Sequence, residues 1–431
     1  MSSGEHVEVS ERSRAFRSRH IGPSGGDLDF MLRELNLAHI DELIERTIPA
    51  SIRTNLDDSK LPAPTSEADV LSKLRGIASM NQPMTSMIGL GYYDTEIPAV
   101  IKRNVLENPA WYTAYTPYQP EISQGRLETL FLFQTVVSEL TGLPVSNASM
   151  LDEPTAAAEA MTLARRVWNG DDSSPFLIDR DTHPQTIAVI ETRAKPLGIP
   201  TQIVDLSEEL PEGFAVLISY PASSGSVKSP ERAITSIHER GGIAIAATDL
   251  LALTLLKSPG EWGFDIAVGS AQRFGVPMGF GGPHAGFLAV RAGMERSIPG
   301  RLVGESIDAH GNRAYRLALQ TREQHIRREK ATSNICTAQA LLANISALYA
   351  MWHGADGLRA IAQRVHNFAT SIKVSAHNAG LRVSDDEVFD TITITGVDAE
   401  QLRRQVLAEG INIFVRDGKT ISISVDERTT P

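Results

Sequence analysis

Six short apolar runs alternate with stretches long enough for helices through residues 175–290, and this alternation constrains the fold more than any other feature. The runs are residues 176–178, 202–204, 214–219, 243–247, 266–268 and 287–290. Strands that are apolar on both sides belong to sheets covered by helices on both faces. The pattern therefore predicts an α/β domain with a mostly parallel sheet. A glycine-rich turn at residues 279–284 interrupts the alternation before the last run.

The segments on either side differ from this region in their pattern of apolar residues, and together the three regions predict three domains. Residues 1–80 read as an N-terminal helical segment, with helices expected at 27–37 and 67–80. Residues 81–330 form the large α/β domain, and residues 331–431 a smaller α+β lobe. Further helices are expected at 124–140, 152–168, 229–240, 332–352, 358–379 and 398–409. Strands of the lobe are expected at 387–395, 411–415 and 420–425.

Composition excludes several classes of function. The chain has 41 Lys and Arg against 52 Asp and Glu, a net charge of −11, so a nucleic-acid or anionic-membrane partner is not expected. No apolar stretch is long enough to span a bilayer. The single cysteine, Cys336, excludes an internal disulfide and a cysteine-based zinc cluster, and it fits a reducing compartment. The charged amino terminus lacks the apolar core of a secretory signal, so a cytoplasmic location is expected.

Several common catalytic motifs are absent from the sequence. There is no His-Glu-x-x-His zinc motif, no Gly-x-x-x-x-Gly-Lys-Ser/Thr phosphate loop and no Gly-x-Ser-x-Gly nucleophile elbow. The glycines at residues 279–282 have the wrong spacing and context for a dinucleotide fingerprint. These absences argue against a zinc hydrolase, a P-loop nucleotidase, a serine hydrolase and a dinucleotide-dependent enzyme.

One arrangement matches the commonest fold of pyridoxal-phosphate enzymes in part. In that fold an Asp at a strand end pairs with the pyridinium nitrogen, and a Lys after the next strand forms the Schiff base. Asp249 follows the run 243–247 and fills the first position, but Gln272 stands in the second. A carboxamide nitrogen is delocalised and cannot form the imine. The alternative is that Asp249 simply caps a strand end.

At these residues the chain resembles the amino-terminal half of the P-protein family of the glycine cleavage system. Two motifs carry the resemblance most specifically. They are Tyr-Thr-Ala-Tyr-Thr-Pro-Tyr-Gln-Pro-Glu-Ile-Ser-Gln-Gly at 112–125 and Thr-Arg-Glu-Gln-His-Ile-Arg-Arg-Glu-Lys-Ala-Thr-Ser-Asn-Ile-Cys-Thr at 321–337. Shorter matches occur at 19–23, 89–95, 147–160, 247–253, 259–263 and 268–283, so the resemblance spans most of the chain.

The resemblance implies an aminotransferase-like fold of type I with a smaller α+β C-terminal lobe. It also implies half of an oligomeric pyridoxal-phosphate enzyme that decarboxylates glycine and passes the aminomethyl group to the lipoyl arm of the H-protein. The lysine that holds the cofactor would sit in a second half, the partner of this chain. No lysine of this sequence follows a strand at the required position.

The resemblance also implies that loops of this half reach a cleft shared with the second half. The catalytic candidates are Tyr92, Tyr93, Tyr112, Tyr115 and His325. The cofactor-binding candidates are Asp249, Thr321, Arg322 and Gln324. Tyr offers a polar tip on an apolar body, and Arg and His bind carboxylate or phosphate groups. The alternatives are tyrosines that only pack loops onto the core and arginines that form a solvated ion-pair cluster.

Two departures from the family pattern bear on this expectation. The chain ends where the second half would begin, so a fragment, a split-gene product and a natural subunit all remain open. Pro154 stands where the family usually has Gly, and proline removes a backbone donor where the fold would cradle a phosphate. Alternative functions are a non-catalytic scaffold that stabilises and docks the lysine-bearing half, and an independent small-molecule binding protein that has lost catalysis.

Overall fold

The computed structural model describes residues 20, 22–23, 25–54, 65–113, 117–320, 326, 328–335 and 339–431. The chain divides into two compact units, Met1–Pro83 and Met84–Pro431. The candidate site lies entirely in the second unit.

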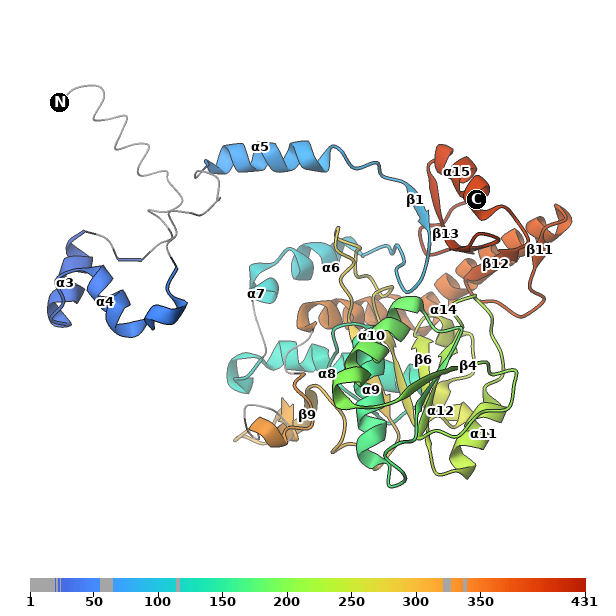
Figure 1. Ribbon diagram of the computed structural model, residues 1–431, viewed down its shortest axis with the longest axis horizontal. Helices are drawn as coiled ribbons and strands as arrows, with labels where there is room; N and C mark the ends of the chain where they lie inside the picture. Colours follow the sequence, from blue (N-terminus) through green and yellow to red (C-terminus); the bar gives the residue numbers. More distant parts are fainter. Residues whose placement is uncertain are drawn as a thin grey trace. The chain divides into compact units, whose positions relative to one another are not determined.

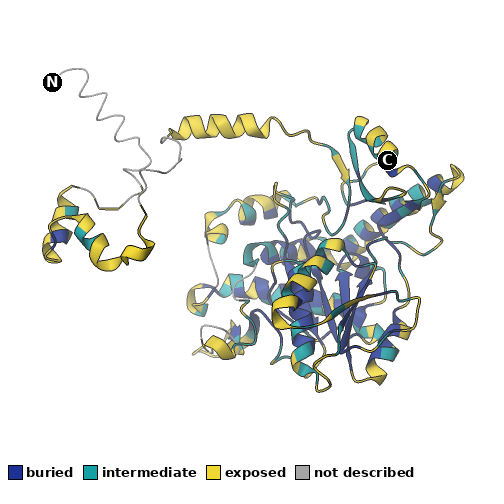
Figure 2. Ribbon diagram, in the orientation of Figure 1, coloured by how far each residue is buried: buried dark blue, intermediate teal, exposed yellow. Residues whose placement is uncertain are grey.

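The first unit is helical. It contains α3 (Gly26–Glu34), α4 (Ile40–Thr47), η1 (Ala50–Ile52) and α5 (Glu67–Ala78). Side chains close two helix starts: His39 accepts a hydrogen bond from the N–H of Glu42, and Ser66 accepts one from the N–H of Asp69. Every residue of α5 is exposed, including four apolar ones (Figure 2). The helices predicted over 27–37 and 67–80 are confirmed, with ends shifted by a few residues.

The second unit is built on a seven-stranded sheet in the order β2-β8-β7-β6-β5-β3-β4. Figure 1 labels two of its strands, β4 and β6. The strands are β2 (Val145–Ser146), β3 (Phe176–Asp179), β4 (Thr201–Val204), β5 (Ala215–Tyr220), β6 (Ile243–Asp249), β7 (Ile266–Ser270) and β8 (Gly286–Val290). Strands β3 to β7 pair in parallel, whereas β8 runs antiparallel to β7 and β2 antiparallel to β8. The six predicted strands and the mostly parallel sheet are thereby confirmed.

Both faces of this sheet are buried, as the continuous apolar runs require (Figure 2). Along β5, Ala215 and Leu217 join one core with residues of α9 (Glu153–Val167) and α10 (Pro184–Ala194). Val216 and Ile218 join the opposite core with α8 (Gln124–Thr141), α11 (Glu231–Glu239) and α14 (Ala340–Asn378). This alternation between two apolar cores explains why the first four residues of the strand are all apolar.

A second, five-stranded sheet has the order β1-β13-β14-β12-β11. Its elements are β1 (Thr85–Met87), β11 (Arg382–Val383), β12 (Thr391–Thr395), β13 (Ile411–Asp417) and β14 (Thr420–Ser424), with α15 (Ala399–Ala408) packed beside it. Strand β1 pairs in parallel with β13. The predicted helix at 398–409 and the last two predicted strands are confirmed.

Three features differ from the sequence predictions. The two helices expected at 332–352 and 358–379 are assigned as one element, α14, with a non-helical backbone at Gly354. Strand β1 was not predicted, and β9 (Leu302–Ile307) and β10 (Arg313–Ala318) form an antiparallel hairpin where no strands were expected. The hairpin was missed because it is polar and half exposed. We propose that the boundaries between the three predicted domains lie at residues 80 and 330.

Short helical segments connect these elements. They are α6 (Ala99–Ile101), η3 (Lys102–Leu106), α7 (Pro109–Tyr112), η4 (Pro120–Ile122), η5 (Lys195–Leu197), η6 (Ala252–Thr254), α12 (Pro259–Trp262) and η8 (Arg328–Lys330). Among the described residues, no helix is both long enough and apolar enough to cross a membrane.

Candidate functional site

A polar pocket lies at the carboxyl ends of β5, β6 and β7, where open α/β sheets commonly place their ligands. The strand ends contribute Ser219, Asp249 and Ser270. Residues of the 89–95 loop, the start of α9 and the start of β12 complete its wall. The sequence therefore pointed to the correct end of the sheet through Asp249 and Gln272.

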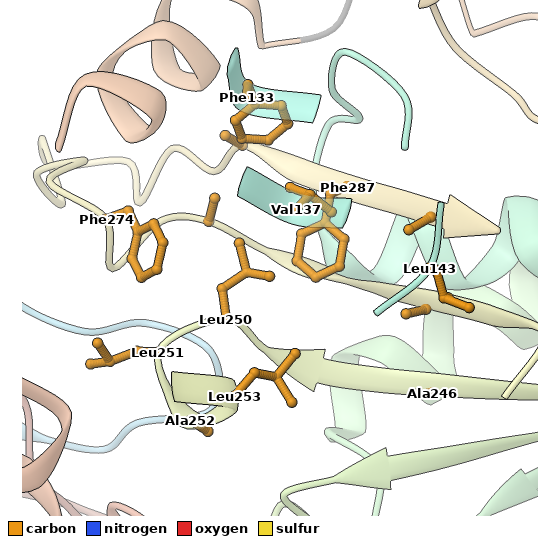
Figure 3. Close-up of a cluster of buried hydrophobic side chains, with 14 of the residues drawn as sticks. Phe133, Val137, Leu143, Ala246, Leu250, Leu251, Ala252, Leu253, Phe274 and Phe287 are labelled. Carbon is orange, nitrogen blue, oxygen red and sulfur yellow. The ribbon is translucent and has the colours of Figure 1, made fainter. Parts of the chain in front are cut away.

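The loops after β6 and β7 are fixed by apolar residues that directly follow the polar ones. Leu250 follows Asp249, and Phe274 follows Arg273; both are buried in one core cluster with Phe287 of β8 (Figure 3). This cluster gives the strand-end side chains little freedom to shift, because displacing them would pull Leu250 or Phe274 out of the core.

Gln272 is almost completely buried, and its side chain is hydrogen-bonded to the backbone of the 89–95 loop. Its Nε2 donates to the carbonyl oxygens of Tyr93 at 2.7 Å and Val276 at 2.8 Å. Its Oε1 accepts from the N–H of Tyr93 at 3.0 Å. Both amide hydrogens and the carbonyl are thus used within the protein. Gln272 is therefore a structural connector between two loops.

Arg273 neutralises the carboxylate at the position of the pyridinium partner. Its Nη1 donates to Asp249 Oδ2, and also to Asp390 Oδ2 at 2.9 Å. The guanidinium lies 3.6 Å from the ring centroid of Tyr93, and the arginine side chain is only 4% exposed. Burial opposes the positive charge, but Asp249 and Asp390 outweigh it and raise the pKa of Arg273 above its ordinary value. The three side chains form an ion cluster that is largely buried.

The start of α9 is equally specialised. Asp152 caps it as predicted, its Oδ1 accepting from the N–H of Thr155 at 2.8 Å. Glu153 lines the pocket and accepts a hydrogen bond from the Thr186 hydroxyl at 2.9 Å. Burial raises the pKa of Glu153 to about 7 and lowers the pKa of the neighbouring pocket residue His183 to about 4. Near neutral pH the His183 imidazole is therefore uncharged.

These residues do not fit pyridoxal phosphate. Gln272 cannot form the imine, both of its amide hydrogens already bond within the protein, and Asp249 is already paired with Arg273. At the start of α9, where a phosphate would be held, Asp152 and Glu153 oppose an anion and Pro154 lacks the N–H donor. The part of the chain that the structure describes also contains no cluster of metal-ligating side chains.

The unusual acidity of Glu153 predicts a pH-dependent stability. Between the ordinary pKa of 4.5 and about 7, the unfolded chain releases a proton that the folded chain retains. The contribution of Glu153 to the free energy of unfolding is therefore fully present below this pH window, and it is lost as the pH rises through the window. Glu153→Gln keeps an oxygen for Thr186 and removes the ionisation. We expect this variant to gain about 1–2 kcal/mol of unfolding free energy near pH 8 and almost nothing near pH 4.5.

Urea unfolding of wild type and variant at both pH values measures this difference. A gain of equal size at both pH values would show that packing, and not the proton on Glu153, causes it. Titratable groups far from Glu153 contribute equally to both proteins and cancel in the comparison.

The structure sorts the predicted site residues into three groups. Tyr93, Asp249 and Gln272 meet in the pocket. Tyr92 lies beside it, half exposed, with its ring edge-on to His284 at 4.7 Å between centroids. Tyr112 ends α7, is exposed and does not line this pocket. The remaining candidates lie outside the described residues: Tyr115, Thr321, Arg322, Gln324 and His325.

Four ionisable residues of the pocket were not predicted from the sequence: Glu153, His183, Arg273 and Asp390. A signal existed for Arg273, because an arginine directly after a buried strand in an otherwise uncharged segment must find an acid partner. No local signal marks Asp390, which directly precedes β12 of the five-stranded sheet and is far from Arg273 in the sequence.

Comparisons with known proteins agree with the fold. The family described as "Glycine cleavage system P-protein" matches residues 18–431. A glycine dehydrogenase (decarboxylating) of Gluconobacter oxydans (strain 621H) is 56% identical over 419 residues, 96% of this chain but 44% of that protein. Its namesake from Rhodopseudomonas palustris (strain BisA53) is 53% identical over 98% of this chain and 44% of its own length. The chain thus spans less than half the length of these curated relatives.

Solved structures extend the comparison. A chain of glycine decarboxylase (P-protein) of the glycine cleavage system, in inhibitor-bound form, matches with a TM-score of 0.85 and 34% identity. The match covers 95% of this chain and 96% of the solved one. Cysteine desulfurase of Thermococcus onnurineus NA1 matches with a TM-score of 0.56 and 12% identity, over 86% and 96% of the two chains. This distant match shows the fold alone, and it confirms the predicted aminotransferase-like fold of type I.

Proposed function

Since the chain belongs to the glycine cleavage system P-protein family, we propose that it is one half of a pyridoxal-phosphate-dependent glycine decarboxylase, competent only with a lysine-bearing second half. The assembled enzyme would decarboxylate glycine and transfer the aminomethyl group to the lipoyl arm of the H-protein, whose disulfide is reduced. The two curated relatives are long enough to contain a second half, because this chain matches only 44% of their length. We place the enzyme in the cytoplasm.

One observation supports the proposal that only the second half binds the cofactor covalently. Gln272 stands where the Schiff-base lysine would be, and both of its amide hydrogens and its carbonyl oxygen bond to backbone groups of Tyr93 and Val276. We therefore assign covalent anchoring of the cofactor to the second half. This half contributes the 89–95 loop, which Gln272 holds in place, to a cleft that both halves share. The cofactor, when bound in the second half, supplies the electron sink for decarboxylation.

Reconstitution tests this proposal. The chain alone, incubated with pyridoxal phosphate and borohydride, should carry no pyridoxyl-tagged lysine by mass mapping. Co-expressed with the carboxy-terminal half of the Gluconobacter oxydans relative, it should support glycine-dependent release of carbon dioxide at least about 1,000-fold above the chain alone. A stably tagged lysine in the isolated chain, or full turnover without the second half, would contradict the proposal.

A non-catalytic scaffold is the second candidate, and the bonding of Gln272 to backbone groups within the protein favours it. The two functions separate at Tyr92, which is half exposed and has no structural hydroxyl bond among those described. In the shared-cleft function, Tyr92→Phe lowers turnover of the reassembled enzyme without loosening assembly. In the scaffold function, the same variant leaves turnover unchanged. Steady-state kinetics of the co-purified complex distinguishes them.

A further inference from the structure

The loop between β7 and β8 presents one aromatic side chain directly to solvent. Phe280 is fully exposed, more than any other large apolar residue among those described. It lies within a run of ten uncharged residues, Phe274–Pro283, and its neighbours Gly279, Gly281 and Gly282 carry no side chains that could cover it. An isolated exposed leucine would need no explanation, but a whole phenylalanine at the tip of a glycine-rich loop does.

The loop is built to hold that position. Its backbone turns through left-handed conformations at Gly279, Phe280 and Gly282, with φ of 51°, 62° and 60°. The N–H of Gly282 donates to the carbonyl of Met278 at 2.6 Å and closes the turn. A left-handed phenylalanine costs about 1–2 kcal/mol relative to glycine. Such a cost at an exposed side chain points to a function for the side chain, since folding alone would favour glycine.

The loop is also braced against the site. The Tyr92 ring packs so closely on Gly282 that a Cβ there would lie 2.7 Å from the ring. Tyr92 meets His284 edge-on, and His284 Nδ1 is 2.7 Å from the hydroxyl of Ser270, which lines the pocket. The contacts that support the loop therefore run from Gly282 through Tyr92 and His284 to Ser270 of the strand-end pocket.

We propose that Phe280 is an anchor residue that inserts into an apolar pocket of the carboxy-terminal half of the P-protein when the two halves assemble. This inference rests on the proposed function, because it requires a second half. More than half the length of the curated relatives lies outside this chain and is available to provide the pocket. The loop has no charge, so the complementary surface is apolar and aromatic anchors of this kind dominate the binding free energy.

Affinity measurements on full-length chains test the anchor. Phe280→Ala should weaken association with the co-expressed carboxy-terminal half of the Gluconobacter oxydans relative by about 10- to 100-fold, and Phe280→Tyr should retain it. Ile203→Ala removes a half-exposed apolar side chain from β4, the opposite edge of the sheet, and should leave affinity unchanged. Phe280→Trp should show a blue-shifted emission on assembly, because the ring leaves water.

The outcomes separate this inference from the function on which it rests. If wild type assembles and is active while Phe280→Ala binds within twofold of wild type, the proposed role of Phe280 is wrong, whereas the proposed half-enzyme function is supported. If wild type neither assembles nor supports turnover, both are wrong. If wild type alone forms dimers that Phe280→Ala dissociates, the occupant is a second copy of this chain and the anchor to the other half is overturned.

Discussion

Replacing Arg273 by methionine should lower the free energy of unfolding by about 3–5 kcal/mol, among the largest effects of any single change in this protein. The substitution leaves Asp249 and Asp390 buried near each other without the shared guanidinium. Removing one member of a buried ionic cluster is costly because the remaining charges lose their partner but do not regain water. Urea unfolding at neutral pH measures the loss.

The pH dependence and a matched control give this prediction its specificity. Burial raises the pKa of Asp249, so its carboxylate should take up a proton as the pH falls and the loss should shrink. Arg180→Met removes an arginine whose ion pair with Asp205 is largely exposed, and it should cost less than about 1 kcal/mol. Equal effects at both arginines would mean that the buried cluster contributes no more than a surface pair.

Replacing Gly225 by alanine should cost about 3–5 kcal/mol or prevent soluble expression. A Cβ at this position would lie 1.8 Å from the carbonyl oxygen of Thr391 in β12, and its φ of +92° is unfavourable for any side chain. Backbone cannot move aside here, because neighbouring groups also join the two segments: the hydroxyl of Thr393 donates to the carbonyl of Ser224 at 2.8 Å.

Gly198→Ala is the control for backbone conformation alone. Gly198 has a similar positive φ of +65°, but no atom lies within 4 Å of the place that an added Cβ would take, so the change should cost only about 1–2 kcal/mol. Thermal and urea unfolding of both variants measure the difference. If the two substitutions cost the same, the close approach between Gly225 and Thr391 does not hold the five-stranded sheet against the large one.

The central sheet was predictable because its strands are buried on both faces, which leaves an unbroken apolar signature in residues 215–218 of β5 and 243–247 of β6. The hairpin β9–β10 was not, because its half-exposed strands carry arginines and a glutamate at positions that a surface loop would also use. Strand β1 has only three residues and depends on a partner far along the chain. Local sequence cannot reveal such pairing.

The candidate site was predictable only in part, for a similar reason. The position of Asp249 and the absence of a lysine at 272 could be read from the spacing of strands and residues. What Gln272 does instead could not, since its partners are backbone groups of Tyr93 and Val276. The ion cluster needs Asp390, which folding brings to Arg273 from a different sheet. Chemistry within one loop can be predicted from sequence, whereas chemistry assembled by tertiary packing requires the structure.

The parallel pairing of β1 with β13 has a consequence for synthesis of the protein. Residues 85–87 emerge early from the ribosome, but their partners at 411–413 are made more than 300 residues later. The five-stranded sheet therefore cannot close, and β1 stays unpaired, until β13 has left the ribosome. Premature termination before residue 411 would leave this sheet incomplete and expose its apolar face to chaperones and proteases.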